Sequence, residues 1–414
     1  MNLSLTQIGL GLLLVLIQAL AAVPWVLAWN WQALTSRRPG AAGRGAGLAV
    51  PLLVALAVVV VGGVAAGFFL GTVGDRDSLA AWGRFYGALL EAQLTADLFV
   101  VVFAVLLAAW PKGGAVALAA FREGIRQPMF WLLALLGAGT LAVSPFIPYF
   151  TFGEDYKMVE EIGYDTIMVV SLLFATLAAS MSISDEIEGR TAITLMSKPV
   201  SRRQFLLGKF AGILLAALVL TAGLGLLFDG LMLYTRWYDN ADPVAVATPL
   251  ADQMRAWAGS TNVPDLVRGI ELWGHDAGRA LPGLILGACQ VMVLLAVAVS
   301  LATRLPMVIN LVICLGVYFL GHLTPVLVQI AQQRAGPQAG GSPVAQMLSF
   351  MAQLFDTLLP ALDFFSLGTS VVRDAPLPMG AFLAYVASVC FYGALYTTIV
   401  LVFGLILFED RDLA

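Results

Sequence analysis

The chain has 414 residues, of which 60% are hydrophobic and 12% are charged, and its formal net charge is −4. About 25% of the residues of a typical soluble domain are charged, so this composition excludes an ordinary soluble protein. The slightly negative charge and the absence of a long basic stretch in the sequence argue against a nucleic-acid partner. The apolar runs are long and do not alternate with polar residues, which predicts membrane-spanning helices rather than the strands of a barrel.

The hydropathy pattern predicts an all-α polytopic integral membrane protein with about nine transmembrane helices. Loops rich in Arg and Lys mark the cytoplasmic side, so we expect a cell-membrane protein with its N-terminus outside and its C-terminus in the cytoplasm. No charged side chain precedes Arg37, so the start lacks the basic region of a signal peptide, and we expect the first helix to be retained. The expected spans are Ile8 to Trp29, Leu48 to Val73, Leu90 to Trp110, Met129 to Tyr149, Thr166 to Ile183, Phe205 to Leu227, Leu281 to Thr303, Met307 to Val328 and Met379 to Leu407.

The second expected span carries a glycine repeat. Gly63, Gly67 and Gly71 recur at every fourth residue. This spacing lets the backbones of two helices approach each other closely inside a membrane. It predicts close helix packing and carries no information about a substrate.

The third expected span contains Asp97, the deepest carboxylate that the pattern places in the membrane. An acidic residue inside a membrane is a candidate functional residue. Glu91, Gln93 and Thr95 precede it, however, and a span that begins later would leave Asp97 at the membrane interface. We favour the exposed, interfacial position and keep Asp97 as a possible intramembrane acid.

The loop before the fourth span holds Lys112, Arg122 and Arg126 against a single acid, Glu123. This excess of positive charge predicts a cytoplasmic loop. Within it, Ala117 to Ile125 is expected to form a short helix on the inner membrane surface.

The longest segment expected outside the membrane runs from Tyr234 to Arg279. It is too short for an independent domain, so we expect a small external cap. Asn262 and Pro264 predict the start of a short helix in this cap.

The histidines and cysteines show no metal-binding or disulfide pattern. His275 and His322 stand at unrelated positions, and Cys289, Cys314 and Cys390 fall inside expected spans without CxxC spacing. We therefore expect no metal site and no cofactor, and we interpret the cysteines as small core residues.

A helix is also expected before the last span, from Ser342 and Pro343 to Pro360. Its apolar face consists of Val344, Met347, Leu348, Met351, Leu354, Phe355 and Leu358. Its other face has no cation, so we expect it to pack on, or dip between, the outer ends of the spans rather than to bind anionic headgroups.

The charged stretch from Ser182 to Lys209 separates the fifth and sixth spans. It predicts a short helix with Ser184 as N-cap, Asp185 and Glu186 in the first turn, and an end before Pro199. One face of this helix carries Ile187, Thr191 and Leu195.

The order of residues in this stretch resembles the intracellular loop of ABC transporter permeases of the type-2 exporter class. The matching residues are Glu186, Glu188, Gly189, Thr191, Leu195, Lys198-Pro199-Val200, Ser201-Arg202 and Gly208-Lys209. Arg190 separates Gly189 from Thr191, which are usually adjacent in that class, and we interpret it as an insertion in a solvated turn. Residues 359–367 and the terminal Phe408-x-x-Arg411-Asp412-Leu413 also resemble that class, most closely its members linked to the maturation of multi-copper enzymes.

The resemblance implies a six-span permease core in residues 113–414, with an elbow helix, a cytoplasmic coupling loop and an outer re-entrant segment, after an added three-helix segment in residues 1–112. It also implies a homodimer or heterodimer of permeases, served by separate ATPase subunits. The residues expected to contact the ATPase are Glu186, Ile187, Glu188, Gly189, Thr191, Leu195, Pro199 and Arg202.

The sequence has no GxxxxGK[ST] motif, so we expect ATP hydrolysis on another subunit and no enzymatic activity of this chain. A secondary transporter or channel is one alternative, and a membrane scaffold or assembly subunit is another. Transporters and channels usually carry ionisable residues and paired broken helices inside the membrane. Apart from Asp97, the sequence offers little of this kind.

Overall fold

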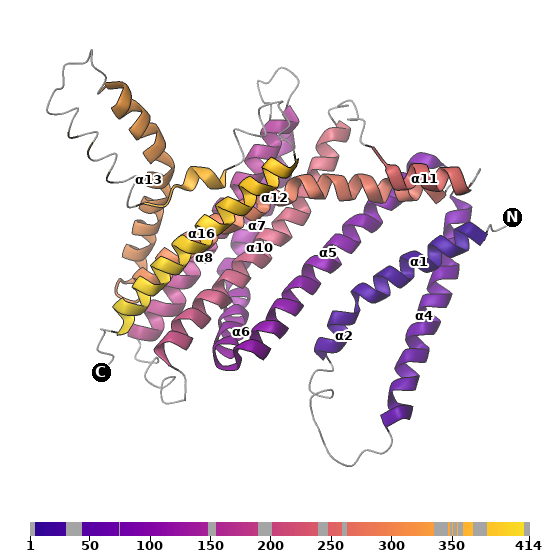
Figure 1. The fold of residues 1–414 in the computed structure, drawn as a ribbon, viewed down its shortest axis with the longest axis horizontal. Helices are drawn as coiled ribbons and strands as arrows, with labels where there is room; N and C mark the ends of the chain where they lie inside the picture. The colour runs from indigo at the N-terminus through magenta and orange to yellow at the C-terminus, as the bar shows by residue number, and fades with distance from the viewer. Residues whose placement is uncertain are drawn as a thin grey trace. The chain divides into compact units, whose positions relative to one another are not determined.

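The computed structural model describes residues 5–29, 44–73, 75–147, 155–188, 201–238, 247–258, 263–334, 347, 350, 354, 359–366 and 379–409. All regular elements in these ranges are helices (Figure 1), which confirms the all-α prediction. They are α1 (Leu5–Ala21), α2 (Val23–Trp29), α4 (Arg44–Thr72), α5 (Arg76–Ala109), α6 (Pro111–Arg126), α7 (Pro128–Val143), η1 (Ser144–Phe146), α8 (Asp155–Glu188), α10 (Arg202–Tyr238), α11 (Pro249–Ala258), α12 (Val263–Ala302), α13 (Met307–Arg334), η2 (Leu362–Phe365) and α16 (Met379–Glu409).

Among the described residues, eight helical stretches are long and apolar enough to cross a membrane. They lie in α1 with α2, in α5, in α7 with η1, and in α8, α10, α12, α13 and α16. The second expected span coincides with α4. The apolar stretch of α4 whose side chains are described, Leu56–Thr72, is shorter than the eight stretches above. The chain is therefore a polytopic membrane protein.

The chain divides into two compact units. The N-terminal unit consists of Met1–Ala108 and Asp242–Arg279, and the core unit consists of Ala109–Ala241 and Ala280–Ala414. The N-terminal segment expected from the sequence, residues 1–112, lacks the second piece of this unit, because that piece comes more than a hundred residues later in the chain. Helix α12 contributes residues to both units.

In the N-terminal unit, α1 and α4 pack antiparallel through glycines. A Cβ atom on Gly67 would lie 2.8 Å from the Cα of Ile8, and one on Gly63 would lie 2.7 Å from the Cα of Leu12. Side chains cannot come so close to a backbone, so this packing requires glycine. The prediction of close packing is confirmed for these two glycines, whereas Gly71 makes only ordinary contacts.

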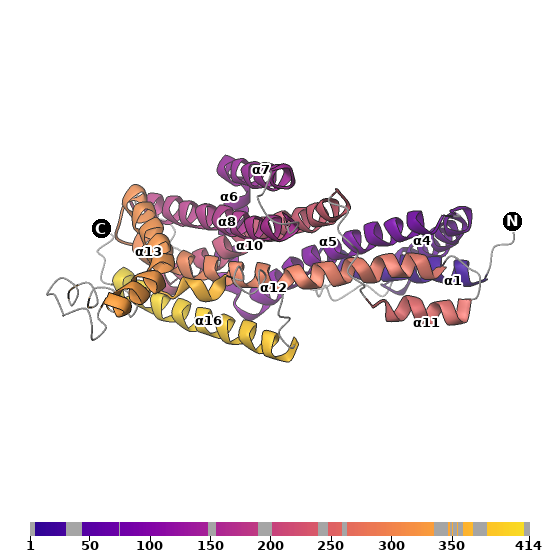
Figure 2. The ribbon, with the colours of Figure 1, turned by 90° about the horizontal axis from the view of Figure 1, so that it is seen from above.

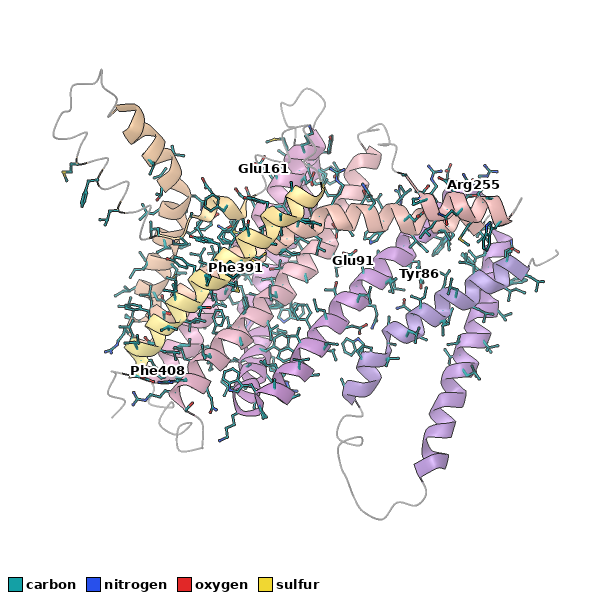
Figure 3. The ribbon with its side chains drawn as sticks, in the orientation of Figure 1. Tyr86, Glu91, Glu161, Arg255, Phe391 and Phe408 are labelled. Carbon is teal, nitrogen blue, oxygen red and sulfur yellow. The ribbon has the colours of Figure 1, made fainter. Side chains whose placement is uncertain are left out.

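Helix α5 runs parallel to α1 in the same unit. The Tyr86 hydroxyl donates a hydrogen bond of 2.8 Å to the Leu14 carbonyl, and the Gln93 amide donates one of 3.4 Å to the Ala21 carbonyl (Figure 3 labels Tyr86). Both bonds satisfy backbone carbonyls with neutral donors. The contacts between α1 and α5 therefore involve no ion pair at these positions.

The expected external cap needs correction. Helix α11 lies beside the start of α12 in both views (Figures 1 and 2), and Glu271 accepts hydrogen bonds from the amides of Leu250 at 2.8 Å and Ala251 at 3.0 Å. The helix that begins at Val263 does not end within the cap but continues through Pro282 to Ala302 as the 40-residue α12. The expectation of a short helix was wrong because the first part of α12 carries polar side chains, among them Glu271, which are typical of a loop outside the membrane.

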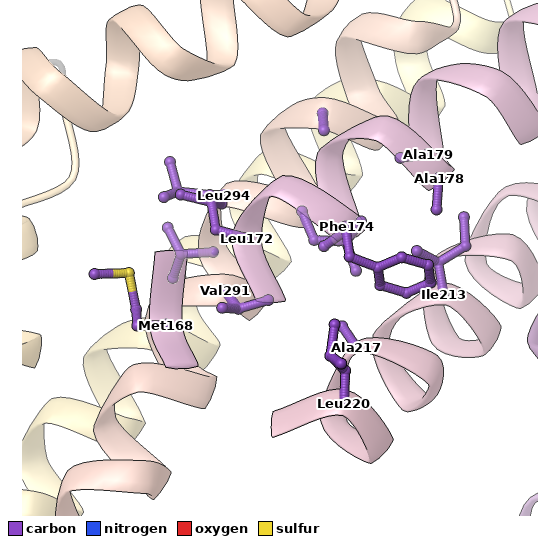
Figure 4. Packing of buried hydrophobic residues seen from close by; sticks show 14 of the residues in the cluster. Met168, Leu172, Phe174, Ala178, Ala179, Ile213, Ala217, Leu220, Val291 and Leu294 are labelled. Atoms are coloured by element: carbon purple, nitrogen blue, oxygen red, sulfur yellow. The ribbon is translucent and has the colours of Figure 1, made fainter. Parts of the chain in front are cut away.

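Helix α8 is the central helix of the core unit. In the most apolar stretch of α8, 72% of the residues are buried inside the protein, against 28% in the corresponding stretch of α7 and η1. Phe174 on α8, Ile213 on α10 and Leu294 on α12 belong to one hydrophobic cluster that joins these three helices (Figure 4). Because lipid tails are as apolar as these side chains, the cluster stabilises the core unit through close packing of the three helices rather than through removal of apolar surface from water.

The second part of α12 runs parallel to α16 (Figure 2). The Ser300 hydroxyl donates a hydrogen bond of 2.9 Å to the Val400 carbonyl, and the thiol sulfurs of Cys289 and Cys390 lie 3.5 Å apart. Helix α13 follows α12 after a tight turn that contains Arg304, in agreement with the short gap between the expected spans that end at Thr303 and begin at Met307.

The segment before α16 is described in part. Residues 359–366 contain η2, in which Leu362 and Phe365 are buried. The Ala361 amide donates a hydrogen bond of 3.1 Å to the hydroxyl of Tyr392, so this segment packs on α16. Except for Met347, Phe350 and Leu354, the helix expected between residues 342 and 358 lies outside the described residues.

Candidate coupling site

The ends of three core helices meet at the side chain of Lys209, which is only 6% exposed. Its Nζ atom lies 2.6 Å from Oε1 of Glu186, 2.7 Å from Oγ of Ser182 and 3.2 Å from Oε2 of Glu123. Lys209 comes from α10, Ser182 and Glu186 come from α8, and Glu123 comes from α6. We call these four residues the lysine cluster.

The lysine cluster contains one cation and two carboxylates, and Nζ of Lys209 contacts one oxygen of each of its three partners. A buried ammonium group loses its hydration, and close acidic and hydroxyl partners are needed to offset that loss. Removing one partner of a buried ion pair commonly costs about 3–5 kcal/mol. The lysine cluster therefore fixes the last turns of α8 to α10 and to α6.

A second set of contacts holds the C-terminal end of α16. The Nη1 atom of Arg202 donates hydrogen bonds to the carbonyls of Phe408 at 3.1 Å and Glu409 at 2.9 Å, and Nε of Arg304 donates one of 3.0 Å to the Leu407 carbonyl. The last carbonyls of a helix have no partner within the helix and form its negative end, so cations stabilise them. We call this set the arginine cap.

Aromatic rings and a surface ion pair support the arginine cap. Phe408, labelled at the end of α16 in Figure 3, is fully buried and stacks on Phe205 with ring centroids 6.0 Å apart. Arg203 and Glu409 form an ion pair of 2.9 Å, but both side chains are substantially exposed, so this pair contributes little. The start of α10 is thus attached to the end of the last span.

Ser184 connects α8 to the turn between α12 and α13. Its hydroxyl lies 3.1 Å from the Leu305 carbonyl and 3.4 Å from the Ala302 carbonyl. The expectation that Ser184 caps a new helix is wrong, because α8 continues through it to Glu188. Because Lys209 satisfies the charge of Glu186, the span extends into the charged stretch without a break.

The structure brings together only some of the residues that were expected to contact an ATPase. Glu186 faces the interior and binds Lys209, and Arg202 binds the end of α16. Ile187 and Glu188 belong to the last turn of α8, and their side chains are not described. Gly189, Thr191, Leu195 and Pro199 lie outside the described residues.

Asp97 belongs to the N-terminal unit and is buried, with 6% exposure. The expectation of an exposed carboxylate is therefore wrong. The Gln93 amide donates a hydrogen bond of 3.1 Å to Oδ1 of Asp97. Nearby on the same helix, Glu91 accepts a hydrogen bond of 2.8 Å from the indole of Trp273. Glu91 and Gln93, two of the polar residues before Asp97, thus have partners within the protein.

Sequence reasoning did not assign a role to Glu123, Ser182, Lys209 or Arg304. A signal for two of them is present in the sequence. Lys209 is the only charged residue between Arg203 and Asp229, and Glu123 is the only acid among the cations of its loop. An isolated ionisable residue at the edge of an apolar run predicts a buried partner of opposite charge.

The described histidines and cysteines form no cluster of three or more metal-binding side chains with acidic residues. Nδ1 of His322 lies 3.0 Å from the Tyr318 carbonyl, and its other ring nitrogen lies 3.3 Å from the amide of Gln290. These contacts engage both ring nitrogens of His322 within the core unit.

The fold and the site define an α-helical membrane protein whose spans are tied together at one end by ionic contacts. The sequence model of the family described as "ABC-2 family transporter protein" matches residues 114–413, which is more than half of the chain. The chain therefore belongs to the ABC-2 family and is a membrane permease component of an ABC transporter. The match begins within α6, so α1, α2, α4 and α5 precede it. No curated protein matches the chain.

Proposed function

We propose that this permease takes up movement from a separate ATPase subunit through residues 189–200 and delivers it to its spans through the lysine cluster and the arginine cap. The observation that carries the proposal is the anchoring on both sides of these residues. Helix α8 ends at Glu188, two residues after Glu186 of the lysine cluster, and α10 begins at Arg202 of the arginine cap.

Anchoring matters because a partner shifts a conformational equilibrium only by interacting differently with its two states. A force applied between residues 188 and 202 acts on α8 and α10 at their ends. Through Glu123 it also acts on α6, and through Arg202 on α16. Four core helices would therefore respond together to one contact.

In this proposal the expected contact residues divide into two groups. The contact with the ATPase is made by Thr191 and Leu195, together with Ile187, Glu188, Gly189 and Pro199. Glu186 and Arg202 act instead as anchors inside the permease, because each already has partners there.

The remaining features of the assembly follow from the family and from charge. The membrane permease would work as a homodimer or heterodimer, with its N-terminus outside and the lysine cluster on the cytoplasmic side. Family membership favours this function over a secondary transporter, a channel or a scaffold. The resemblance to permeases linked to multi-copper enzyme maturation is the one lead toward a physiological role.

The test is the variant Leu195→Asp, which would place a charge in a buried contact. We expect it to abolish co-purification of the ATPase subunit while the permease still inserts into the membrane, because burying an unpaired charge is costly. Leu250→Asp, at an exposed leucine of α11, is the matched control and should retain the ATPase. Undiminished association and transport with Leu195→Asp would refute the proposal.

A further inference from the structure

Helix α6 has one face packed against α10. Its buried residues are Gly113, Gly114, Ala117, Ala120 and Gly124. On α10, a Cβ atom on Gly208 would lie 2.8 Å from Cβ of Val116, and one on Gly212 would lie 2.8 Å from Cβ of Ala120. This close approach leaves no room for a ligand on the inner face of α6.

The outward face of α6 is cationic. Lys112, Arg122 and Arg126 are all exposed on it. The acid on this helix, Glu123, is already bound to Lys209. Within the part of the chain that the structure describes, no carboxylate forms an ion pair with any of the three cations. Glu123 is itself 43% exposed beside them, so the face carries three cations against one acid that already binds Lys209.

Because α6 joins two helices that are long and apolar enough to cross a membrane, we expect its charges to lie near a membrane surface. Helix α6 lies between α5 and α7, with Trp110 just before it and the exposed Trp131 in the first turn of α7. Tryptophan is enriched where a membrane meets water, and amphipathic helices with cations on the polar face lie in this region.

We propose that Arg122 and Arg126, one turn apart on α6, form a binding site for the headgroup of an anionic phospholipid, with Lys112 about 15 Å away along the helix as a separate positive charge. A phosphodiester is the chemical complement of this face, because an Arg guanidinium donates two parallel hydrogen bonds to phosphate oxygens and Lys supplies a further positive charge. The site is distinct from the lysine cluster but adjacent to it, since Arg122 precedes Glu123 in the sequence. A bound headgroup thus stabilises α6 next to its contact with Lys209.

The experiment compares two double variants of the purified permease by native mass spectrometry, with phosphatidylglycerol or phosphatidylcholine added in known amounts. R122Q/R126Q removes two arginines of the site, and R268Q/R279Q removes two exposed arginines of α12 as the control. Each cation near an anionic headgroup strengthens binding about fivefold. We expect R122Q/R126Q to weaken phosphatidylglycerol binding about 25-fold and the control to change it less than about twofold.

Two further arms decide the chemistry of the ligand. Phosphatidylcholine binding should be weaker than phosphatidylglycerol binding and should not change in either variant, and inorganic phosphate at millimolar concentration should not displace the lipid. Equal phosphatidylglycerol affinity in wild type and R122Q/R126Q would overturn the proposal. So would a loss of ATPase co-purification in R122Q/R126Q with unchanged lipid affinity, because the face would then serve a protein partner.

Discussion

In the N-terminal unit, α1 and α4 meet backbone to backbone at Gly63 and Gly67, and α1 meets α5 through hydrogen bonds from neutral side chains. In the core unit, α6, α8 and α10 meet at the buried cation of Lys209, and α16 ends on two arginines. Glycine packing is non-ionic and depends on close fit. Ionic contacts are strong when buried and are lost as a whole when one partner moves or is removed. The comparison teaches that the ionic contacts of these core helices lie on both sides of residues 189–200, which we propose as the contact with an ATPase.

The largest effect is expected when the lysine cluster is broken. Lys209→Met leaves Glu186 and Glu123 without their cation, and we expect the free energy of unfolding of the permease to fall by about 3–5 kcal/mol. Thermal unfolding of the purified chain measures this. Arg268→Met, which removes an exposed arginine of α12, is the control and should change stability by less than about 0.5 kcal/mol.

A neutral version of the same cluster separates stability from coupling. K209M/E123Q/E186Q removes all three charges, so no buried charge is left unpaired, and it should recover part of the lost stability. Stimulation of the ATPase by this triple variant should be lower than by the wild-type permease, because the ionic link between α6 and α8 is gone. Full stimulation in this triple variant would show that the lysine cluster is purely structural.

A smaller effect is expected from glycine packing in the N-terminal unit. Gly67→Val places a branched side chain against the backbone of Ile8, and overpacking of this kind costs about 1–3 kcal/mol. Gly9→Ala is the control, because a Cβ on Gly9 would meet nothing within 4 Å. The stability of the N-terminal unit should fall in Gly67→Val, while ATPase stimulation by the core unit is retained. A loss of stimulation would mean that the two units act together.

The arginine cap should contribute less to stability than the lysine cluster or the glycine packing. Arg304→Gln removes a cation from the end of α16 and its hydrogen bond to Leu407, which should cost about 1 kcal/mol. Hydrogen exchange should increase in the last turn of α16 and not in its middle. Arg268→Gln, at an exposed arginine of α12, should leave hydrogen exchange in α16 unchanged. An equal increase of exchange in the last turn and in the middle of α16 in the Arg304 variant would contradict the role of this residue as a cap.

The smallest effect is expected at Asp97. Asp97→Asn keeps an oxygen that accepts the hydrogen bond from Gln93, so we expect the free energy of unfolding to change by less than about 0.5 kcal/mol and ATPase stimulation to stay normal. Loss of stimulation at normal expression would show that the negative charge itself is required. Asp97→Leu, which leaves the Gln93 amide without this partner, provides the comparison.

Sequence reasoning predicted those features that depend on residues close together in the chain. The long apolar runs predicted the helices, the spacing of Gly63 and Gly67 predicted close packing, and the short helix expected at Ala117 to Ile125 lies within the longer α6. Each of these signals is local, since helix formation and small-residue spacing are read within a few turns.

The features that were missed depend on contacts between distant segments. Glu123 and Lys209 are 86 residues apart in the chain, and only the packing of α6 on α10 brings them together. Ser184 was assigned as an N-cap because its local sequence fits one, but tertiary contacts let α8 continue past it. Asp97 was expected to be exposed because the partners of its neighbours, Trp273 for Glu91 and Ala21 for Gln93, lie in distant segments of the chain.

The pair of thiols between α12 and α16 gives the molecule a native distance reporter. Cys289 and Cys390 are free cysteines whose sulfurs lie 3.5 Å apart, and the third, Cys314, is buried elsewhere next to Asn310. Mild oxidation with copper phenanthroline removes two electrons and two protons from the pair and joins the two helices covalently. The rate of this reaction, followed with and without nucleotide, would record whether the last span slides along its parallel neighbour during the transport cycle, with no label added to the protein.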